Sequence, residues 1–490
     1  MIHKNIISKC ESYSLGKKSK RKFGREQRAS IKLVRNAVPR LHLVLKPRNE
    51  VRPIVRYKSG SMKTFEKYKI KERLAFLKTL HGERKDKLES LFSVLHSNWL
   101  RREQPKLYFV KADLSNAFGS VKRNLLLSII TKKMAGFQNS DQPLQLKNKF
   151  AVHYKELRKE LQKPLLVRVG SAIYEWKLGL VQGYVYSPAL SEVYYSHFDK
   201  LYFSHHLRTS ADELKLFVRV VDDYLYITDS VLDAYSFLKA LSRYENVNYS
   251  KTAANFQYEG IQFTEDVNFL GYTYNTKTLL VNRASNIYTG PICYKIQFTS
   301  SIKDINTFLK RRIGRTGVVI NPLLFNFRSG EEIVWRQIFM TLCISANKFC
   351  TILSILCNES EMLNYLSLYK QQVAVKLCNA MIDVLLRDKL KDSLFKYCIN
   401  HFRYLSWKAL WLCARKTPKC NNLVPYIESE VSKSNCIFGK WREHASQINS
   451  SGECQTKATR IICARPDLRS VMKTFEELPA GFECYKNIFL

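Results

Sequence analysis

The chain has 490 residues, of which 46% are hydrophobic and 12% aromatic. This length allows about three domains and this composition can bury a core, which excludes a small disulfide-stapled scaffold and an intrinsically disordered chain. Lysine and arginine number 80 against 42 aspartate and glutamate, a net charge of +38, so the chain is expected to bind a polyanion. We find neither a run of about 18 uncharged apolar residues nor a signal-peptide pattern. We therefore expect a nucleic-acid partner rather than a membrane.

The 13 cysteines do not follow a metal-binding or disulfide pattern. No two are spaced as CxxC and their number is odd, which argues against a zinc ribbon and a disulfide framework. Cys343, Cys350 and Cys357 recur in an apolar helical stretch. This spacing could serve ligands, but it is more typical of a buried seam. A reducing compartment fits these features.

The first third of the chain begins with a basic segment and continues as mixed strands and helices. Residues 1–30 are expected to be a flexible arm, either a nuclear localisation signal or phosphate-binding tail, or merely a solvated terminus. The text RLHLVLKPRNEVRPIVRY predicts a β-hairpin with Lys46 and Arg52 near its tip. A helical stretch precedes a buried strand that ends at Asp113, and residues 121–165 are amphipathic and helical.

The middle of the chain continues this α+β pattern. Ser187 and Pro188 are a good N-cap and first residue for a helix. The expected apolar face of that helix consists of Leu190, Tyr194, Phe198 and Leu201. Asp222 and Asp223 stand between two β-rich arms and predict a hairpin turn, followed by a helix near residues 230–243 and further strand-like text.

Beyond about residue 285 the apolar pattern becomes helical. Long amphipathic stretches cover 301–313, 331–357, 361–387 and 391–416. The sequence therefore predicts an α+β region followed by a mainly α-helical domain.

Three acidic residues are the strongest candidates for chemistry. Asp113 ends one apolar strand and Asp222-Asp223 form the turn of a later hairpin; if these strands are neighbours in one sheet, the carboxylates converge. Clustered carboxylates repel one another unless a cation neutralises them, and hard oxygen ligands suit Mg²⁺ or Mn²⁺. Two such ions could activate a hydroxyl and stabilise a leaving pyrophosphate, which is polymerase chemistry. Taken singly, each of these acidic residues is more typical of an ordinary turn.

Five segments in order resemble the palm motifs of reverse transcriptases: FVKADLSNAF, GLVQGYVYSP, VVDDYLYIT, VNYSKTAANF and VNFLGYTYN. Within that superfamily they are most similar to the telomerase reverse transcriptases, and later segments such as FLKRRIGRTGVVINPLLF and ARPDLRSVMKTFEELP resemble the telomerase thumb extension. The resemblance implies a right-hand polymerase fold, with reverse transcriptase fingers and palm over residues 31–285, including a short insertion at 121–165, and a helical thumb extension over 286–490. Only a short segment precedes the hairpin, so telomerase's N-terminal DNA-anchoring and RNA-binding domains are expected to be missing.

The resemblance also assigns roles to residues at the reacting centre. Asp113 and Asp222 would be the principal ligands of two Mg²⁺ ions, for which Mn²⁺ could substitute, with Asp223 and the backbone carbonyl of Leu114 in support. Lys251 would protonate the leaving pyrophosphate or neutralise it.

Further residues would hold the nucleotide. Lys46 and Arg52 would clamp the triphosphate, and Phe118 would either block a ribose 2′-hydroxyl or belong to the core. Gln182 and Gly183 would support the templating pair, where glycine allows close backbone approach.

The remaining assignments concern the nucleic acid. Phe269, Leu270 and Gly271 would form a primer grip or a plain β-turn. A basic cluster would follow the phosphates of an RNA–DNA duplex without sequence choice; its members are Lys310, Arg311, Arg312 and Arg315.

The function implied by the resemblance is RNA-templated synthesis of DNA at chromosome 3′ ends. The expected partners are a telomerase RNA template, a single-stranded telomeric DNA primer and dNTPs, with nuclear localisation at telomeres and an accessory protein in place of the missing domains. Two alternatives stay open: a mobile-element reverse transcriptase, and a catalytically weak nucleic-acid-binding scaffold of the same fold.

Overall fold

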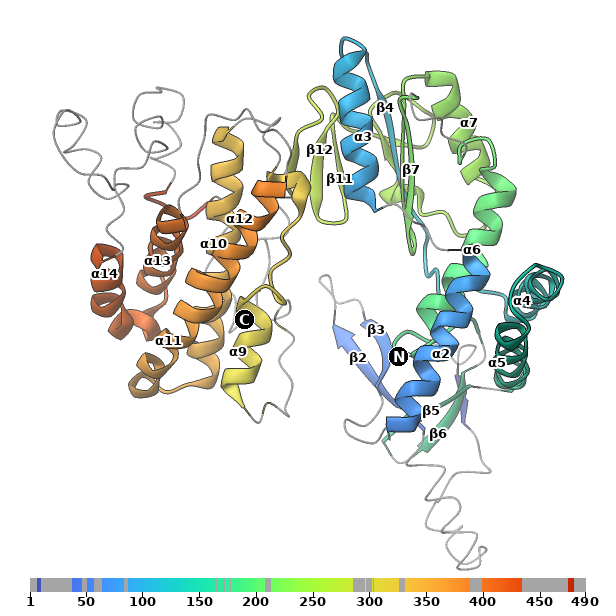
Figure 1. Cartoon of the computed structure of the whole chain (residues 1–490), viewed down its shortest axis with the longest axis horizontal. Coiled ribbons are helices and arrows are strands. Elements are labelled where there is room, and N and C mark those ends of the chain that lie inside the picture. Colours follow the sequence, from blue (N-terminus) through green and yellow to red (C-terminus); the bar gives the residue numbers. More distant parts are fainter. Residues whose placement is uncertain are drawn as a thin grey trace, which may run out of the picture. The chain divides into compact units, whose positions relative to one another are not determined.

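The computed structural model describes residues 7–9, 38–45, 51–56, 64–82, 87–163, 165–170, 172–176, 178–207, 213–284, 296, 302, 304–325, 331–387, 399–433 and 475–479. The chain divides into two compact units, Met1–Val267 and Asn268–Leu490 (Figure 1). The boundary between the units follows Val267, whereas the sequence predicted a boundary after residue 285. The reason is a small sheet that is tied to the helices following it: Gln337 Nε2 donates to Asn282 Oδ1 at 3.0 Å.

The first sheet of the first unit contains the predicted hairpin. Its strands are β2 (Arg40–Leu45) and β3 (Val51–Arg56), which pair antiparallel, and β5 (Leu165–Val169) and β6 (Ala172–Trp176) extend it. β1 (Ile7–Lys9) pairs antiparallel with β6, so three residues of the expected flexible arm join the sheet. The rest of residues 1–30 lies outside the described part of the chain.

The second sheet places the acidic residues. Its order is β10 (Gln262–Phe263), β9 (Ala253–Ala254), β4 (Tyr108–Asp113), β8 (Asp223–Thr228) and β7 (Lys215–Val220). β7 and β8 form the predicted hairpin, and β4 runs antiparallel to β8. The apolar runs of β4 and β8 are buried on both faces, because helices cover the sheet and these strands lie at its centre.

Helices account for most of the described residues of the first unit that lie outside the sheets. They are α2 (Thr64–His81), α3 (Leu88–Arg101), α4 (Arg123–Gln138), α5 (Leu144–Gln162), α6 (Ser187–Tyr202) and α7 (Val231–Leu241). α4 and α5 occupy the stretch predicted to be helical at 121–165 and lie side by side (Figure 1).

Two details of α6 differ from the sequence prediction. The helix begins at Ser187 itself, with Tyr186 as N-cap. Leu201 is 59% exposed, so its placement on the buried face is wrong, and Tyr202 packs on the core instead. The core-facing residues follow a spacing of four, from Leu190 through Tyr194 and Phe198 to Tyr202. Leu201 is one position before this series and therefore points away from the buried face.

A three-stranded sheet begins at the boundary between the units, and the described residues that follow it are mainly helical, as predicted for the region beyond residue 285. The strands are β11 (Asp266–Phe269), β12 (Tyr272–Asn275) and β13 (Val281–Arg283). The helices are α9 (Ile305–Ile313), α10 (Glu331–Leu356), α11 (Leu366–Tyr369), α12 (Cys378–Arg387), α13 (Ile399–Arg415) and α14 (Val424–Lys433). Between α10 and α12 the chain also forms a 3₁₀ segment, Glu359–Tyr365, and a π-helical segment, Lys370–Leu377.

α10 is the core helix of the second unit. By length and composition alone residues Glu332–Leu356 could cross a membrane, although Arg336 and Lys348 interrupt the apolar run, and 72% of the most apolar window is buried within the protein. Its apolar character is accounted for by this burial and by packing against α13 (Figure 1).

The cysteine repeat forms a buried seam on α10 and at the residue that follows it. Cys343, Cys350 and Cys357 are all buried, and the Sγ atoms of Cys413 and Cys420 lie 4.0 and 3.8 Å from the carbonyl oxygens of Cys343 and Cys350. Over the described residues no three histidine, cysteine or acidic side chains are grouped to hold a metal. The burial of the three cysteines confirms the seam prediction.

Candidate functional site

The three acidic residues meet at one end of the central strand pair. Asp113 is the register partner of Asp223 across β4 and β8. The backbone N–H of Leu114 donates to the carbonyl of Asp222 at 3.0 Å, which fixes the turn against the end of β4. The prediction that these strands are neighbours in one sheet is confirmed.

The local electrostatics show that these carboxylates interact. Burial, followed by the charges of Asp222 and Asp113, raises the pKa of Asp223 to about 6. Lys251, delivered by the short 3₁₀ turn Tyr249–Lys251, places its Nζ 3.3 Å from Asp113 Oδ2. Asn248 Nδ2 donates to the same oxygen at 3.0 Å. A cation is thus already drawn to the acidic cluster.

The donor chemistry of this cluster fits a divalent cation. Carboxylate oxygens are the ligands that Mg²⁺ prefers, and a bound cation would relieve the repulsion that raises the pKa of Asp223. In the described residues no three such side chains are grouped to hold an ion, and Lys251 and Asn248 donate to Asp113 Oδ2.

A buried arginine, which sequence analysis missed, supports the acidic turn. Val221 has φ 60°, a left-handed conformation that is rare for a β-branched residue. Arg219, only 3% exposed, donates from Nη1 to the Val221 carbonyl at 3.2 Å. Its Nε donates to Asp199 Oδ2 at 2.6 Å, and its Nη atoms donate to Glu192 at 2.8 and 2.9 Å.

Arg219 of β7 is paired with two carboxylates of α6, Asp199 and Glu192. Burial lowers the pKa of the Arg219 guanidinium, but the carboxylates of Asp199 and Glu192 raise it by more. The pKa of Arg219 therefore lies above its ordinary value. The available signal was a single charged residue inside the apolar run LFVRVV, at a position that faces the core. Such a residue is expected to be paired when buried.

The loop before α6 packs tightly against the first sheet. Gly183 has φ 88°, and a Cβ there would stand 2.2 Å from the Val55 carbonyl oxygen. The Val55 N–H donates to the Gln182 carbonyl at 2.8 Å. The close backbone approach expected at Gly183 therefore exists toward β3, while the nucleotide roles of Gln182 and Gly183 stay predictions.

The position of Phe118 fits the core interpretation, and its ribose-blocking role stays a prediction. Its ring is partly buried and packs against the core cluster of the first unit, and its carbonyl accepts from the Leu180 N–H at 2.7 Å. Lys46 lies outside the described residues. Arg52 is on β3, opposite Val44, and its side chain also lies outside them, so the triphosphate clamp stays a prediction.

The candidate nucleic-acid residues of the second unit occupy a turn and a helix. Phe269 is buried at the end of β11, and Leu270 and Gly271 both have positive φ in the turn to β12. The basic cluster lies on the last turn of α9 and just beyond it; Lys310, Arg311 and Arg315 are exposed and Arg312 is partly buried. The turn interpretation fits the geometry, and the binding roles stay predictions.

Comparison with known proteins gives a fold relationship. No protein-family model matches the chain, and no curated protein matches it. A solved structure of Candida albicans telomerase, in complex with the TWJ fragment of telomeric RNA, is similar over 87% of this chain and 68% of that chain, with a TM-score of 0.52 and 15% identity. In fold, this chain is similar to telomerase.

Further similar structures are also telomerases. Apo telomerase from Candida tropicalis has 14% identity and a TM-score of 0.41, over 89% of this chain and 68% of that one. Apo telomerase from Candida tropicalis without its C-terminal domain has 19% identity and a TM-score of 0.39, over 51% of this chain and 55% of that one. These scores are too low to add to the fold relationship, which rests on the Candida albicans telomerase.

Proposed function

We propose that this chain is the catalytic protein of a telomerase, an RNA-templated DNA polymerase that extends chromosome 3′ ends. The observation that carries the proposal is the pairing of Asp113 with Asp223 across β4 and β8, next to Asp222. The telomerase-like fold is consistent with it. In this proposal the first unit supplies fingers and palm and the second unit supplies the thumb extension.

The acidic cluster would hold the metal ions. Asp113 and Asp222 are the proposed principal ligands, with Asp223 and the carbonyl of Leu114 in support. Two Mg²⁺ ions, or Mn²⁺ in their place, would activate the primer 3′-hydroxyl and stabilise the leaving pyrophosphate when bound. Arg219 would keep the Val221 turn, and with it Asp222, in position.

Other side chains would bind and orient the reactants. Lys251 carries its proton at Nζ within 3.3 Å of Asp113 and would donate it to the pyrophosphate or neutralise that group by charge. Lys46 and Arg52 would hold the triphosphate, and Phe118 would restrict the ribose. Gln182 and Gly183 would support the templating pair.

The proposed partners follow from the charge and from the telomerase fold. The exposed basic residues at the end of α9 would contact duplex phosphates, and the turn Phe269–Gly271 would position the primer end. The Candida albicans structure contains a telomeric RNA fragment, which leads us to propose a telomerase RNA, a telomeric DNA primer and dNTPs as partners. Nuclear localisation at telomeres and an accessory protein are part of the same proposal.

The deciding experiment is primer extension on a pre-annealed RNA template with Mg²⁺ and dNTPs. Wild-type protein and Asp141→Ala, an exposed acidic residue between α4 and α5, should extend the primer. Asp222→Ala should lose extension by at least about 1000-fold, since a metal ligand acts in the transition state, while it keeps its duplex affinity.

Other outcomes would count against the proposal. Tight duplex binding without extension by the wild type would favour the nucleic-acid-binding scaffold. Extension on arbitrary templates by a protein that retains no cellular RNA would favour a mobile-element reverse transcriptase. Parallel loss of binding and extension in Asp222→Ala would indicate a structural role for Asp222.

A further inference from the structure

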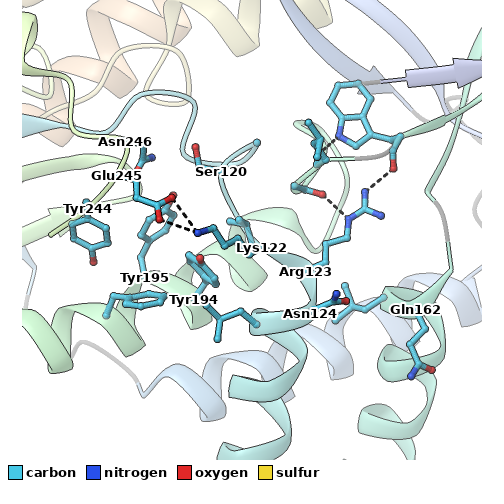
Figure 2. Close-up of a pocket in the computed structure, with 18 of the residues that line it drawn as sticks. Ser120, Lys122, Arg123, Asn124, Gln162, Tyr194, Tyr195, Tyr244, Glu245 and Asn246 are labelled. Carbon is cyan, nitrogen blue, oxygen red and sulfur yellow. Dashed lines mark hydrogen bonds and ion pairs between the residues drawn. The ribbon is translucent and has the colours of Figure 1, made fainter. Parts of the chain in front are cut away.

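A large cavity lies within the first unit, apart from the acidic cluster. Its volume is about 1150 Å³, and it is bounded by the start of α4, the end of α5, β6, α6 and the loop after α7 (Figure 2). Its lining, all from described residues, does not include Asp113, Asp222 or Asp223. Asn246 on its rim bonds to Ser115 through Nδ2 and through its carbonyl, at 2.9 and 2.7 Å.

One side of the cavity is an aromatic wall. It consists of Tyr194, Tyr195, Phe198 and Tyr202 from α6 with Tyr244 from the following loop. Neighbouring ring centroids lie 5.0 Å apart for Tyr194 and Phe198, 5.4 Å for Phe198 and Tyr202, and 5.1 Å for Tyr202 and Tyr244. Phe198 and Tyr202 are partly exposed. Such preordered rings can stack a planar ligand at low entropy cost.

Cationic groups stand beside this wall. The guanidinium carbon of Arg243 lies 5.8 Å from the Tyr202 ring centroid, and Lys122 immediately precedes α4. Lys122 Nζ is paired with Glu245 at 3.0 Å, and the two side chains are 61% and 81% exposed; Figure 2 shows the pair at the cavity. Exposed ion pairs contribute little stability, so a ligand anion can replace the Glu245 carboxylate at Lys122.

The first turn of α4 adds to the positive potential. It contains no acidic residue and no side-chain cap, although the partial positive charge at a helix N-terminus favours an acid there. Arg123, in that turn, is committed to the chain itself, because it donates to the carbonyls of Gly179 and Trp176 at 2.7 and 2.9 Å. Lys163 also lines the cavity, but we assign Lys122 and Arg243 to a ligand because they stand beside the aromatic wall.

We propose that this cavity binds a nucleotide unit, with its base stacked on Phe198 and Tyr202 and its phosphate held by Lys122 and Arg243. A planar ring and an adjacent anion are what the aromatic wall and the two cations together complement. A volume of about 1150 Å³ leaves room for a nucleotide unit, since small-ligand pockets are roughly 300–1,000 Å³. The site is separate from the proposed polymerase centre and does not depend on that function.

Free nucleotides and single-stranded nucleic acid share this chemistry, and photocross-linking can separate them. Full-length protein is irradiated with 5-iodo-deoxyuridine monophosphate, or with a five-nucleotide single strand carrying one 5-iodo-deoxyuridine, and the cross-linked peptide is identified by mass spectrometry. We expect a cross-link to the aromatic wall, from the strand, the monophosphate or both. Asp141→Ala should cross-link like the wild type, since this exposed residue is outside the cavity.

Charge variants with opposite expected effects test the assignment. Lys122→Gln should weaken the apparent affinity about tenfold, the loss of one charge-assisted hydrogen bond, whereas Glu245→Gln should strengthen it because Lys122 no longer has a competing carboxylate. Lys132→Gln, an exposed lysine on the same helix outside the cavity, should bind like the wild type.

The outcomes are decisive in both directions. A wall cross-link with the monophosphate alone identifies a free-nucleotide site, and one with the strand identifies a single-strand site; either supports the proposal. The proposal is overturned if no wall peptide is cross-linked, or if Lys122→Gln and Glu245→Gln change affinity in the same direction, which would indicate a merely structural ion pair.

Discussion

At the residue scale, Asp223 and Arg219 differ in their electrostatic surroundings: Asp223 lies beside charges of its own sign, whereas Arg219 lies beside charges of the opposite sign. Asp223 is partly buried beside two other carboxylates, and its pKa is raised to about 6 by burial and by their charges. Arg219 is fully enclosed but compensated by Asp199 and Glu192. Neutralising the first should therefore relieve repulsion, whereas neutralising the second should leave buried carboxylates unpaired.

The variant Asp223→Asn tests the repulsion. In EDTA it should raise the thermal midpoint of the protein by about 1–2 °C, a modest gain because the carboxylate is only partly buried. Adding Mg²⁺ should raise the midpoint of the wild type more than that of Asp223→Asn, because the variant keeps the principal ligands Asp113 and Asp222 but lacks the repulsion and a supporting ligand. Differential scanning fluorimetry with and without Mg²⁺ measures both effects. A lower midpoint for the variant in EDTA would contradict the repulsion.

The variant Arg219→Gln tests the support of the acidic turn. Breaking a buried ion pair leaves an uncompensated charge and costs about 3–5 kcal/mol, so the opening free energy of β7 and β8 should fall by that amount. Hydrogen exchange followed by mass spectrometry localises the loss to these strands. Arg158→Gln, at an exposed position on α5, is the control and should leave their protection unchanged. Equal protection in both variants would remove the role assigned to Arg219.

At the element scale, glycines fix how the loop before α6 packs. Gly179 has φ 62°, and a Cβ there would stand 2.3 Å from the Gly119 carbonyl oxygen. Gly183 meets β3 at Val55 in the same way. The loop is thus held between the segment after β4, at Gly119, and strand β3 of the first sheet, at Val55.

Alanine substitutions at two glycines should act in opposite directions. Gly183→Ala should destabilise the protein by about 2 kcal/mol or more, because the conformation is left-handed and the Cβ meets backbone. Gly136→Ala, within α4 with nothing near its Cβ position, should stabilise it by about 0.5–1 kcal/mol. Urea unfolding followed by circular dichroism measures both. Destabilisation of equal size at both sites would show that the close approach at Gly183 has no special cost.

At the scale of the whole molecule, the net charge of +38 makes nucleic-acid affinity depend strongly on salt. Removing one cation that binds a phosphate reduces the slope of log affinity against log salt by about 0.7–0.9. This dependence distinguishes lysines and arginines that touch phosphates from those that are only solvated.

A triple variant tests where duplex phosphates bind. Replacing Lys310, Arg311 and Arg315 with glutamine should reduce the salt slope for an RNA–DNA duplex by about 2–3. Fluorescence anisotropy over a salt series gives the slope. The matched control replaces three exposed lysines of α4 and α5 with glutamine; they are Lys132, Lys155 and Lys159. A larger change of slope in the control would place the duplex elsewhere.

Local patterns in the sequence determined the elements and their order. The hairpin at β2 and β3, the strand ending at Asp113, the turn at Asp222 and the buried cysteine seam follow from apolar periodicity and turn residues, which act between near neighbours in the chain. The meeting of Asp113 with Asp223 was also foreseen, because strands that end in acidic residues place them at one sheet edge once they pair.

Only the tertiary structure decided the interactions between distant segments. Arg219 with Asp199, Lys122 with Glu245 and Asn246 with Ser115 are separated by 20, 123 and 131 residues. The unit boundary at Val267 likewise depends on which helices hold the small sheet. Tertiary packing sets these interactions. The sequence shows that a residue is charged, but its partner is decided by which segments are buried together and how closely their backbones approach.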